Sequence, residues 1–171
     1  MLLNKEQIHS IQNKKTTYVK NFVSLEREYD FNLISNLLEE NTDKIFTRAL
    51  TDREHLKHIY VLKNVINTLK EFKFFFDFLF KLFKFKPNPK DDIDIYFSLI
   101  SQVGSPHKDM ENVFIIGLKG KTVYRVFEED TNNYEINKGD MIFIPSNVKH
   151  KAIGITPRII ASIGFYGEMN G

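Results

Sequence analysis

Three residues in the second half of the sequence have the types and the spacing of a metal site. His107 and Asp109 are separated by one residue, and His150 follows much later in a chain that contains five histidines. Alternate residues of a strand point to the same side, so an H-x-D unit can direct both side chains at one ion. Two imidazoles and one carboxylate bind iron(II) in one class of non-haem site and leave the opposite face of the ion open. We therefore predict a metal site made by His107, Asp109 and His150.

The residues that precede His150 make this pattern more specific. An H-x-D unit alone is common by chance, and a lone histidine in a strand is more often packed or exposed than bound to a metal. Here Gly139 and Asp140 form a predicted tight turn, a short apolar strand follows at 141–144, and Pro145 precedes His150 by five residues. A fold that winds back through the intervening strands would bring His150 beside the H-x-D unit.

Composition and charge narrow the classes of protein that this chain can be. The 171 residues are 42% apolar, which is enough for the core of one domain, and they contain no cysteine. Disulfides, thiolate metal sites and a cysteine nucleophile are therefore excluded. The formal net charge of +2 gives no indication of a nucleic-acid partner. No apolar run reaches the roughly 18 residues of a spanning helix, and the N-terminus lacks the apolar stretch of a signal peptide, so we expect a cytoplasmic protein without a membrane partner.

The second part of the chain, residues 91–171, has the pattern of a small β-barrel. Short apolar runs are separated by turn residues such as Lys119-Gly120. This spacing is typical of jelly rolls and small barrels, and it predicts a mainly β fold, a cupin-like double-stranded β-helix. The predicted strands cover 93–102, 112–118, 121–127, 134–136, 141–144, 149–153 and 158–166.

Residues 1–90 are predicted to be a mostly helical part that packs on the barrel and forms one compact unit with it. One strand is expected at 16–23. Ser24 is the predicted cap of a helix that continues through 31–41. The run 51–54 has the pattern of a capping box, and helical spacing behind it predicts a second helix as far as Leu69.

A phenylalanine-rich run at 72–86 fits either a helix or a strand. We favour a helix, because the helical spacing of the preceding segment continues into it and Pro87 and Pro89 end it. The apolar face is expected to cover a sheet, and a homodimer contact through this helix is the main alternative. As a helix, the run places five apolar residues on that face: Phe72, Phe75, Phe76, Leu79 and Phe83.

The segment from Ile95 to Tyr166 resembles the cupin-like, JmjC-type 2-oxoglutarate oxygenases, and among them the factor-inhibiting-HIF-like branch. That branch shares an H-x-D unit, an apolar strand, K-G, a further strand, G-D-x-x-x-I-P and a distal His. The resemblance implies iron(II) at His107, Asp109 and His150, 2-oxoglutarate as cosubstrate, and hydroxylation of a small molecule or an amino-acid side chain. The matching residues here are His107-Lys108-Asp109, 112–118, Lys119-Gly120, 121–127, Gly139-Asp140, Ile144-Pro145 and His150.

A second resemblance, to the smaller metal-binding cupins, fits less well. Their second motif, G-x5-P-x-G-x2-H, matches Gly139, Pro145 and His150, with Asn147 in place of the second glycine. Their first motif requires H-x-H and a following Glu, whereas this chain has H-x-D and apolar residues at 113–114. A ligand set of two histidines and one carboxylate therefore fits better than three histidines and a glutamate.

The resembled branch also binds the distal carboxylate of 2-oxoglutarate through a Lys or Arg on the strand after K-G, and this cation is missing from its usual place. Counting from His107, that position is Thr122. Tyr124 shares the predicted side of Thr122, whereas Lys121 should point the other way unless the register shifts. Arg158, at the start of the last strand, is a second source of the charge. If neither cation serves, the chain is a non-oxygenase metal-binding cupin or an inactive binding or structural module.

Overall fold

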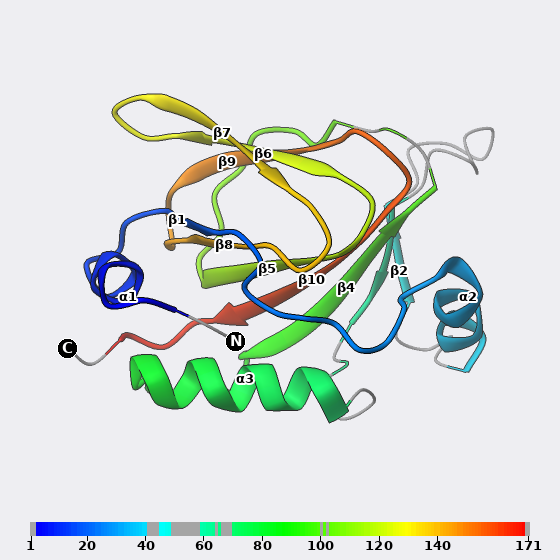
Figure 1. Ribbon diagram of the computed structural model, residues 1–171, viewed down its shortest axis with the longest axis horizontal. Helices are drawn as coiled ribbons and strands as arrows, with labels where there is room; N and C mark the ends of the chain where they lie inside the picture. The colour runs from blue at the N-terminus through cyan, green and yellow to red at the C-terminus, as the bar shows by residue number, and fades with distance from the viewer. Residues whose placement is uncertain are drawn as a thin grey trace.

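The computed structural model describes residues 3–40, 45–48, 59–63, 65, 70–99, 101 and 103–169. Two antiparallel sheets face each other, and helix α3 lies beneath the larger sheet (Figure 1). The described residues form ten strands and three helices. The predicted fold class, a mainly β double-stranded β-helix packed against helices, is confirmed.

The larger sheet has the strand order β1-β8-β5-β10-β4-β3-β2, with every neighbouring pair antiparallel. At its centre, residues 112–118 of β5 are buried on both faces, which explains why this strand is a continuous apolar run in the sequence. The strands are β1 (Thr17–Val19), β2 (Ile45–Arg48), β3 (Ile59–Leu62), β4 (Asp92–Ser98), β5 (Asn112–Lys119), β8 (Met141–Ile144) and β10 (Arg158–Phe165).

The smaller sheet has the order β7-β6-β9, and it covers the inner face of the larger one. Its strands are β6 (Thr122–Phe127), β7 (Thr131–Ile136) and β9 (Lys149–Gly154). Burial alternates along β6, so Thr122, Tyr124 and Val126 point inward. A cluster of apolar residues fills much of the space between the sheets, including Val113, Ile115, Tyr124, Val126, Ile142, Ile144 and Ile160.

The helices are α1 (Lys5–Gln12), α2 (Phe31–Glu40) and α3 (Lys70–Phe83). Helix α3 confirms the helix predicted for the phenylalanine-rich run, and its apolar face packs against the outer face of the larger sheet. The rings of Phe76 and Phe165 lie 4.8 Å apart, and those of Phe83 and Phe114 lie 5.6 Å apart. Homodimer formation through this helix stays a prediction. Within the described ranges, no helix has both the length and the apolar character that a membrane crossing requires.

The first 90 residues contribute more strand than the sequence pattern predicts. Strand β1 confirms the strand predicted at 16–23, but β3 occupies 59–62, where a helix was predicted, so that prediction is wrong there. Val61 is buried and pairs with Tyr96 of β4. The edge of β4 offers this β-branched segment backbone partners, and sheet pairing overrides its helical spacing. Residues 51–58, 64 and 66–69 of the predicted helix lie outside the described residues.

The helix predicted to follow a cap at Ser24 begins later, at Phe31. The N–H of Leu33 donates to Asp30 Oδ1 at 2.7 Å, which makes Asp30 the capping residue. The preceding segment is anchored by the buried ring of Tyr29, which lies 5.6 Å from the ring of Phe72 on α3. The cap at Asp30 and the packing of this ring, rather than a cap at Ser24, thus mark the start of the helix.

The Gly139–Asp140 turn ties strand β1 to the barrel. Gly139 has a φ of +85°, and a Cβ at this position would lie 2.6 Å from the carbonyl oxygen of Val23, so the turn requires glycine. The buried Asp140 carboxylate accepts hydrogen bonds from the Tyr18 hydroxyl (2.9 Å) and from two backbone N–H groups (2.9 and 3.0 Å). Burial and this carboxylate together raise the pKa of Tyr18 to about 12. The G-D pair is therefore a structural clamp.

Candidate metal centre

The backbone joins the two histidines of the predicted site directly. His150 is in β9, and His107 precedes β5 in an isolated bridge that pairs it with His150. The N–H of each residue donates to the carbonyl of the other at 2.9 Å. The chain therefore winds back as the sequence pattern predicts, and main-chain hydrogen bonds set the spacing of the two imidazoles.

The loop before His150 also holds the segment that carries Asp109. The N–H of Asn147 donates to the carbonyl oxygen of Asp109 at 2.8 Å. Asn147 has a φ of +62°, in the left-handed region that glycine and asparagine tolerate best. This explains why asparagine can stand where the smaller metal-binding cupins have a glycine.

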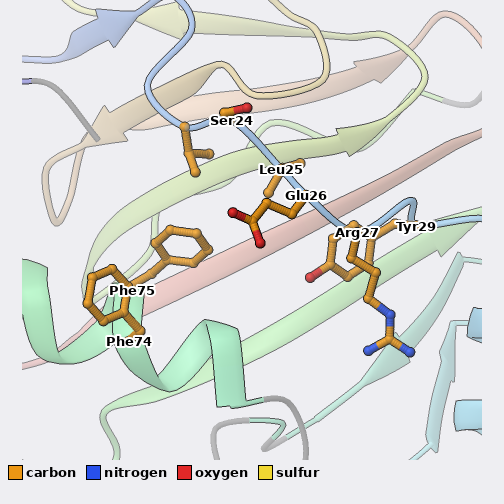
Figure 2. Close-up of a pocket in the computed structure, with 8 residues that line it drawn as sticks. Ser24, Leu25, Glu26, Arg27, Tyr29, Phe74 and Phe75 are labelled. Atoms are coloured by element: carbon orange, nitrogen blue, oxygen red, sulfur yellow. The ribbon is translucent and has the colours of Figure 1, made fainter.

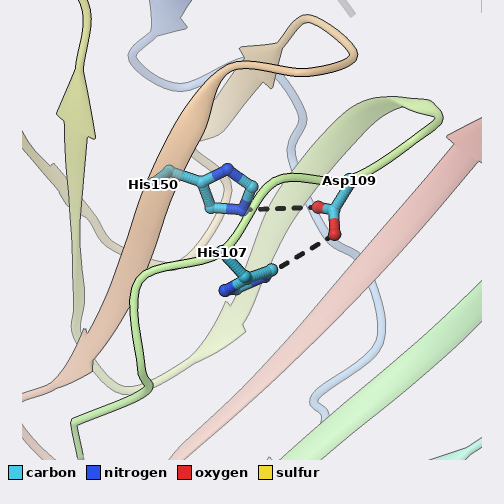
Figure 3. A group of neighbouring side chains, drawn as sticks. All are labelled: His107, Asp109 and His150. Carbon is cyan, nitrogen blue, oxygen red and sulfur yellow. Dashed lines mark ion pairs between the residues drawn. The ribbon is translucent and has the colours of Figure 1, made fainter.

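The side chains of His107, Asp109 and His150 converge (Figure 3). One candidate ligand atom from each residue lies within 4.8 Å of the other two. His107 Nε2 is 3.6 Å from Asp109 Oδ1, and His150 Nε2 is 3.3 Å from Asp109 Oδ2. The two imidazole rings lie 4.5 Å apart between centroids. Three donors of the types that iron(II) binds thus surround a gap of ionic size.

Backbone carbonyls orient both imidazoles. His107 Nδ1 lies 2.9 Å from the carbonyl oxygen of Ser105, and His150 Nδ1 lies 3.0 Å from that of Val148. A carbonyl only accepts, so in each neutral ring Nδ1 carries the proton and Nε2 keeps its lone pair. Metal-binding histidines are held in the same way, with the second ring nitrogen donating to a carbonyl or carboxylate. The donor set therefore fits a metal ion.

The His150 imidazole titrates above its ordinary range. Burial lowers its pKa, but the Asp109 carboxylate and the Val148 carbonyl raise it, with a smaller contribution from Glu111. Together these three effects outweigh burial, so the net pKa is raised. The three side chains differ in exposure, at 3% for His150, 26% for Asp109 and 48% for His107. The site is thus closed on the His150 side and open on the His107 side.

The three residues stand at one end of a cavity of about 160 Å³ between the sheets. Arg158 lines the other end and is 4% exposed. Register fixes this order, because Arg158 pairs with Ser98 at one end of β10, whereas Gly164 pairs with Val113 near the H-x-D unit. Burial lowers the pKa of Arg158, and Tyr124 partly offsets this.

Of the predicted cosubstrate residues, Tyr124 and Arg158 line this cavity with the triad. Burial raises the pKa of Tyr124 well above its usual range, so its hydroxyl remains a donor. Thr122 is 1% exposed on the inward face of β6, and its Oγ1 has no hydrogen-bond partner among the described residues. Lys121 points outward, where its Nζ is 2.9 Å from Glu135 Oε1 and both side chains are partly exposed. The register does not shift to turn Lys121 inward.

Sequence reasoning missed several cavity residues, among them Tyr96 and Glu111. Tyr96 belongs to the alternating pattern of β4, but alternation does not tell which face is the inner one. Glu111 follows Asp109 at the same two-residue interval by which Asp109 follows His107. An H-x-D-x-E spacing was therefore the available signal for Glu111.

A larger hollow, of about 630 Å³, lies between the segment 23–29 and helix α3 (Figure 2). Its described lining includes Glu26, Arg27, Tyr29, Phe74 and Phe75 but no histidine. It therefore shares no residue with the triad and offers no comparable set of metal donors.

Comparison of the fold with solved structures finds strong similarity to the ribosomal oxygenase YcfD from Escherichia coli. One structure of YcfD gives a TM-score of 0.71 at 18% identity, over 97% of this chain and 52% of that one. The barrel has the fold of YcfD. A YcfD structure with cobalt and 2-oxoglutarate gives 0.65 at 18% identity, over 90% of this chain and 48% of that one.

At this identity the likeness concerns the fold alone, and this chain spans about half the length of these YcfD structures. No family model matches the chain, and no curated protein matches its sequence. The assignment to the factor-inhibiting-HIF-like branch stays a prediction.

Proposed function

We propose that this protein is an Fe(II)- and 2-oxoglutarate-dependent oxygenase that hydroxylates a small molecule or an amino-acid side chain. The observation that carries the proposal is the convergence of two imidazole Nε2 atoms and a carboxylate in a cavity whose buried end holds a guanidinium. Two histidines and one carboxylate with open positions are the ligands of non-haem iron oxygenases. The fold shared with YcfD, which has been solved with cobalt and 2-oxoglutarate, supports the same conclusion.

In this proposal His107, Asp109 and His150 hold the metal. Bound iron(II) supplies the redox chemistry that couples oxidative decarboxylation of 2-oxoglutarate to hydroxylation of a C–H bond. The protein fixes the ligands: the carbonyls of Ser105 and Val148 accept from the Nδ1–H groups of the two rings and leave both Nε2 atoms free to bind an ion beside Asp109. The exposed side of His107 leaves a path by which the substrate reaches the site.

Arg158 and Tyr124 bind the distal carboxylate of the cosubstrate. A carboxylate in a closed cavity requires a cation and hydrogen-bond donors to offset the loss of hydration. Arg158 supplies the charge at the buried end, and the protonated Tyr124 hydroxyl supplies a donor. Thr122, whose buried hydroxyl has no partner among the described residues, is the third candidate contact.

A binding experiment under anaerobic conditions tests the proposal. Iron(II) and 2-oxoglutarate together should give the weak visible charge-transfer band of the chelate with the wild-type protein. Asp109→Ala should abolish the band, and Lys121→Met, which changes an outward-facing cation, should retain it. A wild-type protein that binds iron without developing the band would contradict the oxygenase assignment.

One observation favours a second candidate, a metal-binding cupin with other chemistry. The position on β6 that carries a cation in the resembled oxygenases is Thr122. If Arg158 does not bind 2-oxoglutarate, the triad would still hold a metal, and the same experiment would then show metal binding that 2-oxoglutarate does not alter.

A further inference from the structure

The cavity contains an acidic side chain to which the proposed reaction gives no task. Glu111 lines the cavity two residues after Asp109. A Cβ at position 164 would lie 3.2 Å from Glu111 Cγ, so the glycine of β10 leaves the space in which this side chain lies. Glu111 is thus seated against the wall of the cavity at the open end.

The Glu111 carboxylate is held in place but is not neutralised by a cation of the described chain. The Tyr166 hydroxyl hydrogen-bonds to Glu111, and this contact adds to burial in raising the pKa of Tyr166. Lys90 lies 5.7 Å from the Tyr166 ring centroid, but no ion pair joins Glu111 to a Lys or Arg of the described residues.

The inner face of β10 therefore runs between two opposite charges. Arg158 begins this face at the buried end, and Gly164 ends it beside Glu111, about 20 Å along the strand at about 3.3 Å per residue. Ser162 and Tyr124 also line the cavity between these two charges.

We propose that Glu111 recognises a positively charged nitrogen group, an ammonium or a guanidinium, on the substrate. This inference rests on the proposed function, in which the anionic cosubstrate occupies the Arg158 end. The substrate then approaches from the open end, where the fixed charge is negative. A charge-assisted hydrogen bond in a partly desolvated cavity is stronger than a neutral one, and a neutral analogue would leave the carboxylate without its cation.

Binding of small probes to the metal-free protein tests this inference, because Glu111 and Tyr166 are in place without an ion. The cationic probes are N-acetyl-arginine amide and N-acetyl-lysine amide, and the comparison probes are the neutral N-acetyl-glutamine amide and the anionic N-acetyl-glutamate amide. Two-dimensional NMR of the protein measures the affinity for each probe. We expect at least tenfold tighter binding of the cationic probes than of the other two. Free arginine and lysine form a further arm: tighter binding of the capped amides favours a polypeptide substrate, and tighter binding of the free forms favours a small molecule.

Glu111→Gln should abolish the preference for the cationic probes. Glu129→Gln is the matched control, since it removes the same charge from an exposed position in the β6–β7 connection and should preserve the preference. Equal binding of cationic and neutral probes by the wild type, or an unchanged preference in Glu111→Gln, would overturn the inference. The oxygenase proposal is tested by a separate measurement, the charge-transfer band of the wild type with iron(II) and 2-oxoglutarate. This measurement does not depend on the probes, so failure of the two proposals can be distinguished.

Discussion

The two faces of the seven-stranded sheet differ sharply although they are made by the same strands. On β10, Ile159, Ala161 and Ile163 belong to the dry, aromatic-rich core against α3, whereas Arg158 and Ser162 line the cavity. On β4, Ile95 and Phe97 face the core and Tyr96 faces the cavity. Because side chains alternate along a strand, one face can supply stability while the other supplies binding groups. Substitutions on the two faces should therefore affect different measurements.

The largest effect on stability is expected on the outer face. Phe114 is fully buried, and its ring lies 4.7 Å from Phe143 and 5.6 Å from Phe83. Phe114→Ala should lower the free energy of unfolding by about 3–5 kcal/mol, because a cavity replaces a close-packed ring. Urea denaturation measures this change. Phe74→Ala, at a position that is 61% exposed, is the control and should change stability by less than about 0.5 kcal/mol.

On the inner face, the largest expected effect is on metal affinity. His107→Ala and Asp109→Ala should each weaken binding of cobalt(II) by at least about a hundredfold, since loss of a ligand exceeds the effect of losing a supporting contact. Both side chains are partly exposed, so unfolding of the metal-free protein should change little. Calorimetric titration and urea denaturation separate the two quantities. A variant that unfolds would show that the residue belongs to the core, and the division between the faces would fail.

Arg158 sharpens the comparison within the inner face. Arg158→Met should retain metal binding and weaken 2-oxoglutarate binding by about 2–5 kcal/mol, the usual effect of removing one member of a buried charged pair. The measurement is titration of 2-oxoglutarate into the cobalt-loaded protein. Lys121→Met is the matched control and should not change this affinity, because Lys121 pairs with Glu135 outside the barrel. The reverse result would place the cosubstrate cation at Lys121, immediately before β6.

The smallest expected effect is a dependence on pH. The pKa of His150 is raised above its ordinary 6.5. As the pH rises through this pKa, the metal-free protein should lose the stability that the imidazolium gains from Asp109, whereas metal affinity should increase because the proton no longer competes. Denaturation and metal titration between about pH 5 and 8 should thus show opposite slopes. Asp109→Asn removes the carboxylate charge and should flatten the stability slope.

The barrel was predictable because its strands are short, alternating and separated by turn residues. Each of the strands β4 to β10 lies where the pattern placed it, with bounds that differ by a few residues. The segment at 59–62 was not predictable, since Ile59 and Leu62 fit a helix and a strand equally well and only pairing with β4 decides. Local signals fail where a distant segment supplies the backbone partner.

The same reasoning applies to the candidate site. The triad follows from a motif whose spacing reflects strand geometry, and the structure brings its three side chains together. The orientation of Lys121 depends on strand register, and alternation correctly predicts that it points outward. For Arg158 the sequence leaves an inward and an exposed position open, and the structure buries it. Tyr96 has no spacing that ties it to the triad, so only the closed barrel reveals it as a neighbour of the site, whereas the H-x-D-x-E spacing was an available signal for Glu111.

The reciprocal hydrogen bonds between His107 and His150 have a consequence for metal exchange. The protein would not have to fold around a metal ion, so a chelator should remove a bound ion and leave the barrel intact. Reloading should then proceed in a single fast phase limited by collision, without a slow rearrangement of the chain.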